Sequence, residues 1–209
     1  MLALPFARTG DAARVQPMTA LKKPALVTVE DYLAGEERSD IRHEYLGGVI
    51  HAMSGGTNDH AAIAANGILS LGAQLRGKPC RPFGSDAKVR IEYPDHTRFY
   101  YPDLQVVCQQ NSGTDPYQDR QAVVLEVLSE STRRTDMGEK KDAYLTIPSL
   151  KVLMLAESDR SRVVVYRRRS TGGFEAEEYS DMGEVISLAE IGCELPLGDL
   201  YEGIAWGKA

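Results

Sequence analysis

Two acidic residues lie where they could act together on a cation. Glu126 is the one charged residue in the apolar run 122–128, and an ionised carboxylate inside such a buried strand is costly unless it is paired or holds a cation. Asp103 follows Pro102 on a neighbouring predicted strand. Two adjacent carboxylates repel each other unless a proton or a divalent ion separates them. The pair therefore predicts a site for a hard cation with oxygen ligands.

Two further side chains could complete this site. Lys140, on the helix predicted after the Glu126 strand, could position a water molecule or steady a phosphate group. Glu44, on an early predicted hairpin, could supply another carboxylate. Acids and a lysine around a divalent ion are the groups used for phosphodiester hydrolysis. Spacing alone slightly favours a structural alternative, in which Asp103 ends a strand and Glu126 forms a buried salt bridge with Lys140.

The elements that must position these residues are predicted from local patterns. Thr28, followed three residues later by Asp31, predicts the start of a short helix. Residues 42–53 predict a hairpin around two glycines, and residues 59–75 have the apolar spacing of a helix. A third helix is predicted from Asp136 to Leu145. Strands are predicted at 87–93, 99–108, 122–128, 151–156, 162–167 and 174–179.

This order of elements predicts an α+β (mixed α/β) fold around a central mixed sheet flanked by helices. With 209 residues, we expect a single domain at 25–209 after a loosely ordered leader at 1–24. The three cysteines show neither a disulfide framework nor metal-ligand spacing, and the N-terminus lacks the apolar core of a signal peptide. These features predict a protein of the reducing cytoplasm.

Composition limits the partners. The chain has 30 acidic and 24 basic side chains, for a net charge of −6. No stretch approaches the run of about 18 apolar residues that a membrane helix needs, so no membrane partner is expected. The acidic balance also argues against strong, non-specific coating of nucleic acid, which needs a basic surface.

An ordered set of motifs carries a family resemblance from about residue 26 to residue 204. The motifs are RHEYLGG at 42–48, SDAKV at 85–89, YPDL at 101–104, EVLSEST at 126–132, DMGEK at 136–140 and CELPLGDLYEGI at 193–204. On these motifs the sequence resembles the Uma-type bacterial restriction endonuclease family of the PD-(D/E)XK nuclease superfamily. The resemblance implies a restriction-endonuclease-like core with extra hairpin strands, and hydrolysis of DNA phosphodiester bonds with Mg²⁺ or Mn²⁺.

The resemblance also implies roles for individual residues. Asp103 matches the PD aspartate and Glu126 the (D/E)XK acid, so both are expected to ligate the metal, with the backbone carbonyl of Val127 as a further ligand. Glu44 matches the family's early acid. The three acids Glu44, Asp103 and Glu126, together with a lysine, form the expected catalytic set.

The lysine of that motif is displaced in this chain. Leu128 stands at the last motif position, and Lys140 on the next helix resembles a migrated substitute. Lys141 is the neighbouring alternative, although Lys140 has the spacing to Tyr144 that places both on one helical face. His60, which opens the long helix, is expected either to act near the phosphate or to form a helix-start hydrogen bond.

Several properties stay open at the level of sequence. We expect DNA as substrate, a homodimer, and a partner protein if target recognition is specific. A local basic patch of Lys88, Arg90 and Lys140 would contact the substrate. The alternative function is a catalytically weak or inactive binding or assembly module that keeps the nuclease fold as a homo-oligomer.

Overall fold

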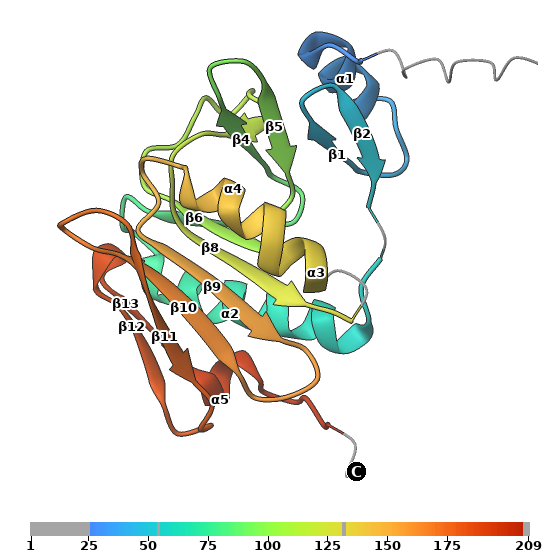
Figure 1. The fold of residues 1–209 in the computed structure, drawn as a ribbon. Coiled ribbons are helices and arrows are strands. Elements are labelled where there is room, and N and C mark those ends of the chain that lie inside the picture. Colours follow the sequence, from blue (N-terminus) through green and yellow to red (C-terminus); the bar gives the residue numbers. More distant parts are fainter. Residues whose placement is uncertain (1–25, 54, 131–132, 207–209) are drawn as a thin grey trace, which may run out of the picture.

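The computed structural model describes residues 26–53, 55–130 and 133–206, so the predicted leader at 1–24 lies outside the described residues. These residues form an α+β structure with a six-stranded mixed sheet, a five-stranded sheet and a two-stranded sheet (Figure 1). Within this part of the chain, no helix has the length and apolar character needed to span a bilayer.

The six-stranded sheet is central. Only β8 and β9 in it run parallel; the other neighbours are antiparallel. Its middle strand β8 is buried on both faces, as the apolar run predicted. In spatial order the strands are β11 (Phe174–Tyr179), β10 (Val163–Arg168), β9 (Val152–Glu157), β8 (Gln121–Leu128), β6 (Leu104–Val107) and β3 (Arg81–Gly84).

Helices cover both faces of this sheet (Figure 1). On one face lies α2 (Asn58–Leu75), whose Ile63 and Leu71 are fully buried in one apolar core with the inward side chains of β8. On the other face lie α3 (Arg133–Thr135), the π-helix η1 (Asp136–Lys140) and α4 (Lys141–Leu145), which pack in a second core. The predicted helix over 136–145 is therefore confirmed, but it is kinked at Gly138, whose φ of −107° and ψ of −106° are not helical.

The second sheet contains the predicted N-terminal hairpin. Its strands lie in the order β2 (Val49–Ala52), β1 (His43–Leu46), β5 (Thr97–Tyr100), β4 (Lys88–Glu92) and β7 (Tyr117–Gln118). The predicted cap is present, since Thr28 accepts a hydrogen bond from Asp31 N–H at the start of α1 (Val29–Glu36). Tyr32 of α1 packs against Tyr45 and Phe99 of the sheet, which joins α1 to β1 and β5.

The predicted single strand over 99–108 is wrong. The chain leaves the second sheet after Tyr100 and enters the central sheet at Leu104. Pro102 lies in the crossing, where its missing N–H would break a continuous ladder. The crossing segment carries Asp103, so this residue lies at the junction of the two sheets rather than within a strand.

Other elements had no clear sequence signal. β3 and β7 are short, and β7 has two residues. The C-terminal part forms β12 (Val185–Leu188), the 3₁₀ turn η2 (Ala189–Ile191), β13 (Cys193–Pro196) and the short helix α5 (Leu197–Leu200), which packs on α2.

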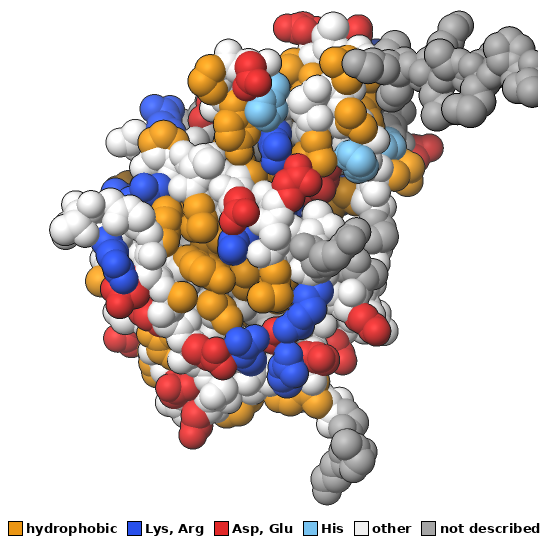
Figure 2. Space-filling model, viewed as in Figure 1, with side chains coloured by type: hydrophobic (Ala, Val, Ile, Leu, Met, Phe, Trp, Pro, Cys, Tyr) orange, Lys and Arg blue, Asp and Glu red, His pale blue; other side chains and the backbone are white. Residues whose placement is uncertain are grey.

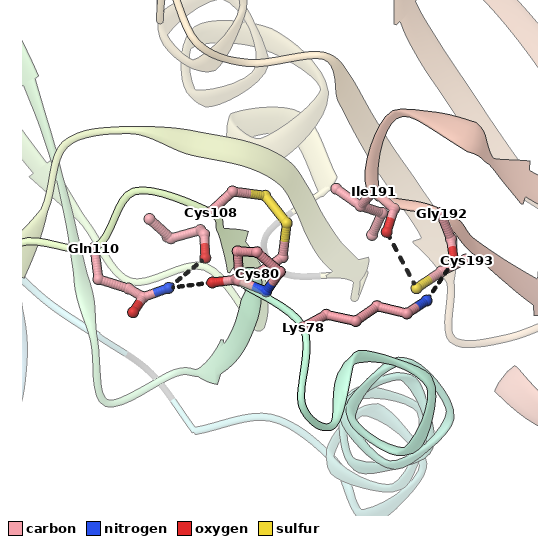
Figure 3. Close-up of a disulfide and its surroundings, with 9 residues drawn as sticks. Lys78, Cys80, Cys108, Gln110, Ile191, Gly192 and Cys193 are labelled. Carbon is pink, nitrogen blue, oxygen red and sulfur yellow. Dashed lines mark hydrogen bonds between the residues drawn. A yellow bond between two sulfur atoms is a disulfide. The ribbon is translucent and has the colours of Figure 1, made fainter.

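The expectation that the cysteines form no disulfide is wrong for one pair. Cys80 and Cys108 are joined by a disulfide, while Cys193 is a buried free thiol (Figure 3). In the antiparallel register, Arg81 of β3 faces Val107 of β6, so the two cysteines one position further along face each other. Their separation of 28 residues gives no hint of this pairing.

Reduction of this disulfide is expected to lower the free energy of unfolding by about 3 kcal/mol, because the bond closes a loop in the unfolded chain. Urea unfolding with and without dithiothreitol measures the difference. A Cys80→Ser/Cys108→Ser variant should lose the response, and Cys193→Ala should keep it. Equal unfolding midpoints in both buffers for the wild type would contradict the expectation.

Candidate active site

The alternation of side chains along β8 directs Glu126 to one face of the central sheet. Val123, Leu125 and Val127 point into the core beneath α2. Val124 and Leu128 point into the opposite core, which contains the α4 residues. Because side chains alternate along a strand, Glu126 shares the face of Val124 and Leu128 and looks toward η1 and α4.

Glu126 is almost completely buried and has two protein partners. Its Oε1 accepts a hydrogen bond of 2.6 Å from the hydroxyl of Tyr144, and Lys140 Nζ lies 3.0 Å from the same oxygen. Burial is the largest influence on this carboxyl; Lys140 lowers its pKa, and the Asp103 and Asp136 carboxylates raise it. The balance raises the pKa of Glu126 to about 8.

Asp103 lies opposite Glu126. In the antiparallel pairing of β6 and β8, Leu104 faces Leu125, so the preceding Asp103 comes level with Glu126. Its Oδ2 accepts a 2.7 Å hydrogen bond from the backbone N–H of Val127. This bond ties the crossing segment between the two sheets to the strand that carries the second acid.

Lys140 joins the two sheets. Its Nζ lies 3.0 Å from Glu126 of β8 and 3.0 Å from Glu44 of β1, and Asp136 is 3.8 Å away. These carboxylates outweigh the lowering effect of burial and raise the pKa of Lys140 above its usual value. The neighbouring Lys141 points elsewhere, because its Nζ pairs with Asp142.

Leu128 occupies the position where the motif would carry its lysine. The side chain is buried on the same face of β8 as Glu126, within the core that includes Tyr100 and Tyr144. A lysine there would have to bury its stem in this apolar core. The amine next to Glu126 comes instead from η1, where Lys140 follows the kink at Gly138.

His60 makes the helix-start hydrogen bond that the sequence suggested as one alternative, and its ring also contacts Asp103. Its backbone N–H is capped by Thr57 Oγ1 at 3.2 Å, at the start of α2. Its ring Nε2 lies 3.2 Å from Asp103 Oδ2. The hydrogen bond to Asp103 raises the pKa of His60 against the opposing effect of burial, so the imidazole contacts the candidate metal ligand.

The two acids each have one oxygen held by the protein. Glu126 Oε1 and Asp103 Oδ2 carry the contacts described above, whereas no residue within the described ranges donates a hydrogen bond to Glu126 Oε2 or Asp103 Oδ1. Three carboxylates, those of Glu44, Glu126 and Asp136, lie within 3.8 Å of the ammonium group of Lys140. This excess of negative charge and these two oxygens suit a hard divalent cation.

A cation at this place would have an incomplete set of side-chain ligands. Among the residues that the structure describes, no three His, Cys, Asp or Glu side chains converge closely enough to hold a metal ion alone. Mg²⁺ commonly binds through one or two carboxylates and keeps several water molecules. The pair Asp103 and Glu126, with the backbone carbonyl of Val127, fits that mode of binding.

The chain matches the family model Uma2, described as "Putative restriction endonuclease", over residues 29–198. It belongs to the Uma2 family. Among the Uma2 protein's curated relatives are two uncharacterized proteins of the cyanobacterium Synechocystis. The protein slr1290 is 29% identical over 178 residues, covering 85% of this chain and 92% of the relative. The protein sll1609 is 26% identical over 154 residues, covering 72% and 86%.

A solved structure shows the same fold. The crystal structure of a putative nuclease belonging to DUF820 from Anabaena variabilis superposes with a TM-score of 0.68. It covers 86% of this chain and 99% of the neighbour, at 17% sequence identity. The mixed α+β architecture expected from the sequence, with a central mixed sheet flanked by helices, is therefore confirmed, and this Uma2 protein shares it with the neighbour.

The predicted basic patch is wrong for the Uma2 chain. Lys88 and Arg90 share the face of β4 opposite to Val89, whereas Val89 packs in the core beneath Tyr100 and Tyr144. Arg90 binds Asp119 with two hydrogen bonds of 2.8 and 2.9 Å. Acidic and basic side chains are intermixed on the face shown in Figure 2. Of the three residues named from the sequence, Lys140 contacts Glu44 and Glu126, whereas Arg90 is paired with Asp119.

Two interactions in the central sheet, one at Glu126 and one beside Leu128, were not predicted from the sequence. From the sequence, Tyr144 indicated only which face of the helix carries Lys140. In the structure its hydroxyl donates a hydrogen bond to Glu126. Its spacing of four residues from Lys140 was the available signal. Glu157, at the end of β9 beside Leu128, is buried and binds Arg133 and Arg162. No pattern in the sequence identifies this carboxylate as a partner of arginines so distant along the chain.

Proposed function

We propose that this Uma2 protein is a divalent-metal-dependent endonuclease that hydrolyses phosphodiester bonds in DNA. The observation that carries the proposal is the arrangement of Asp103 and Glu126. Asp103, directly before β6, comes level with Glu126 of β8, and the described residues bind one oxygen of each acid and leave the other for a ligand. Lys140 stands beside Glu126 as the only ammonium group that the described residues bring to these acids.

Each residue has a defined part in this proposal. Asp103, Glu126 and the carbonyl of Val127 would hold Mg²⁺ or Mn²⁺. The bound ion would supply activation of water and neutralisation of charge on the scissile phosphate. Lys140 would stabilise the negative charge that develops on the phosphate. Glu44 would act as the auxiliary acid that keeps Lys140 charged and oriented, since their atoms are 3.0 Å apart.

The assembly and compartment are part of the same proposal. We propose a cytoplasmic homodimer, with a partner protein if recognition of the target is specific. The outer strand β2 supports self-association, because its Val49 and Ile50 side chains are both 40% exposed at an edge of the second sheet. In a reducing compartment Cys80 and Cys108 would be thiols.

A cleavage assay tests this function. Wild-type protein and an Asp103→Asn variant are incubated with supercoiled plasmid, linear DNA and RNA, in Mg²⁺, Mn²⁺ or EDTA. We expect metal-dependent cutting of DNA that the substitution and EDTA abolish. Cleavage of RNA but not of DNA would show that the substrate is RNA rather than DNA. A folded wild type that cuts none of these substrates in either metal would reject the nuclease and favour a binding module.

A further inference from the structure

The hydroxyl of Tyr144 is placed to control one of the proposed metal ligands. It donates a 2.6 Å hydrogen bond to Glu126 Oε1 from a side chain that is completely buried. We propose that Tyr144 is a positioning residue, which holds the Glu126 carboxylate so that Oε2 is presented to the metal. This inference rests on the proposed function and names a residue that acts through Glu126.

The second partner of Glu126 cannot set this orientation by itself. Lys140 carries its amine on a flexible stem and shares it among Glu126, Glu44 and Asp136. An ammonium group also has three donors that can rotate to suit several acceptors. It lies beside Oε1 and supplies charge to the cluster, but its rotatable donors do not by themselves fix the orientation of the Glu126 carboxylate.

Tyr144 has the rigidity that Lys140 lacks. Its ring packs against Tyr100 with centroids 5.5 Å apart, inside a core that also contains Val124 and Leu128. A packed ring on a helix fixes the position of its hydroxyl, and that hydroxyl has one proton to donate. The donor therefore engages Oε1 in one geometry and leaves Oε2 without a hydrogen bond from the described residues.

Asp103 has a comparable arrangement. Its Oδ2 is held by the N–H of Val127 and lies near His60 Nε2, which leaves Oδ1 without a hydrogen bond from the described part of the chain. One fixed oxygen on each acid would leave the two remaining oxygens to converge on a single ion. Outer partners that orient metal ligands in this way typically contribute on the order of 10- to 100-fold to metal affinity or activity.

The test is the affinity for Mn²⁺ of the Tyr144→Phe variant, measured from the free Mn²⁺ signal in electron paramagnetic resonance without DNA. Phenylalanine keeps the packed ring and removes only the hydroxyl. We expect the dissociation constant to rise by about 10-fold or more. In cleavage assays the metal concentration for half-maximal rate should rise in parallel, with much of the rate recovered at saturating Mn²⁺.

Tyr201→Phe is the matched control. Tyr201 is also buried, and its hydroxyl bonds the backbone carbonyl of Arg162, away from the two acids. The control should bind Mn²⁺ as the wild type does. A Tyr144→Phe variant with wild-type Mn²⁺ affinity would overturn the positioning role while leaving the nuclease proposal in place. A wild type that binds no Mn²⁺ would overturn both the positioning role and the proposed metal dependence.

Discussion

The Glu126→Gln variant should lose metal-dependent DNA cleavage on the order of 10³-fold. Glutamine keeps the shape of the side chain and can still accept a hydrogen bond from Tyr144. It removes the negative charge that would hold the cation opposite Asp103. A catalytic metal contributes several kcal/mol to the barrier, and each 1.36 kcal/mol changes the rate tenfold. Gel assays of initial rates at fixed Mn²⁺ measure the loss.

The Glu126→Gln substitution also allows a test by the pH dependence of folding stability. Burial raises the pKa of Glu126 to about 8 from the usual 4.5, so folding favours its protonated form. The metal-free wild type should therefore lose stability as pH rises from about 4.5 to about 8, as the unfolded carboxyl ionises before the folded one. Glu126→Gln should lack this contribution. Identical pH–stability curves and unchanged cleavage would together remove Glu126 from the site.

The Lys140→Met variant should lower the free energy of unfolding by roughly 3–5 kcal/mol, because removal of one partner leaves buried carboxylates without their counter-charge. Glu126 is almost fully buried, and Glu44 also faces the amine. The raised pKa of Lys140 keeps the amine charged throughout the neutral range. Its contribution to stability is therefore present at neutral pH and is lost only above the usual titration range of lysine. Urea unfolding at pH 9, where Glu126 is ionised in the folded protein and Lys140 is still charged, measures the change.

The Lys141→Met variant is the matched control for the loss of the Lys140 charge. Lys141 is the adjacent residue, is partly exposed and pairs with Asp142 outside the cluster. Its replacement should change stability by less than about 0.5 kcal/mol. The double variant Lys140→Met/Glu126→Gln should recover part of the lost stability, since it removes a buried charge. A Lys140→Met protein as stable as the wild type would show that the amine does not compensate these acids.

Local patterns were sufficient for several elements. The alternating and apolar runs predicted β4 and β8, the helical spacing predicted α2, and Thr28 predicted the start of α1. Each depends on residues close together in the chain. The prediction of one strand over 99–108 was wrong. Apolar residues on both sides of Pro102 suggested a continuous strand, but they belong to strands of two different sheets.

The sequence by itself determined that Glu126 needs a compensating partner, because a carboxylate within a buried apolar strand is costly wherever that strand lies. It also singled out Asp103 and Lys140 as candidate partners. Only the tertiary structure decided that Asp103 comes level with Glu126, that Lys140 rather than Lys141 enters the cluster, and that Cys80 meets Cys108. These outcomes depend on the register between strands and on the kinked helical turn at Gly138. Local sequence patterns do not specify either, since both are set by packing between distant segments.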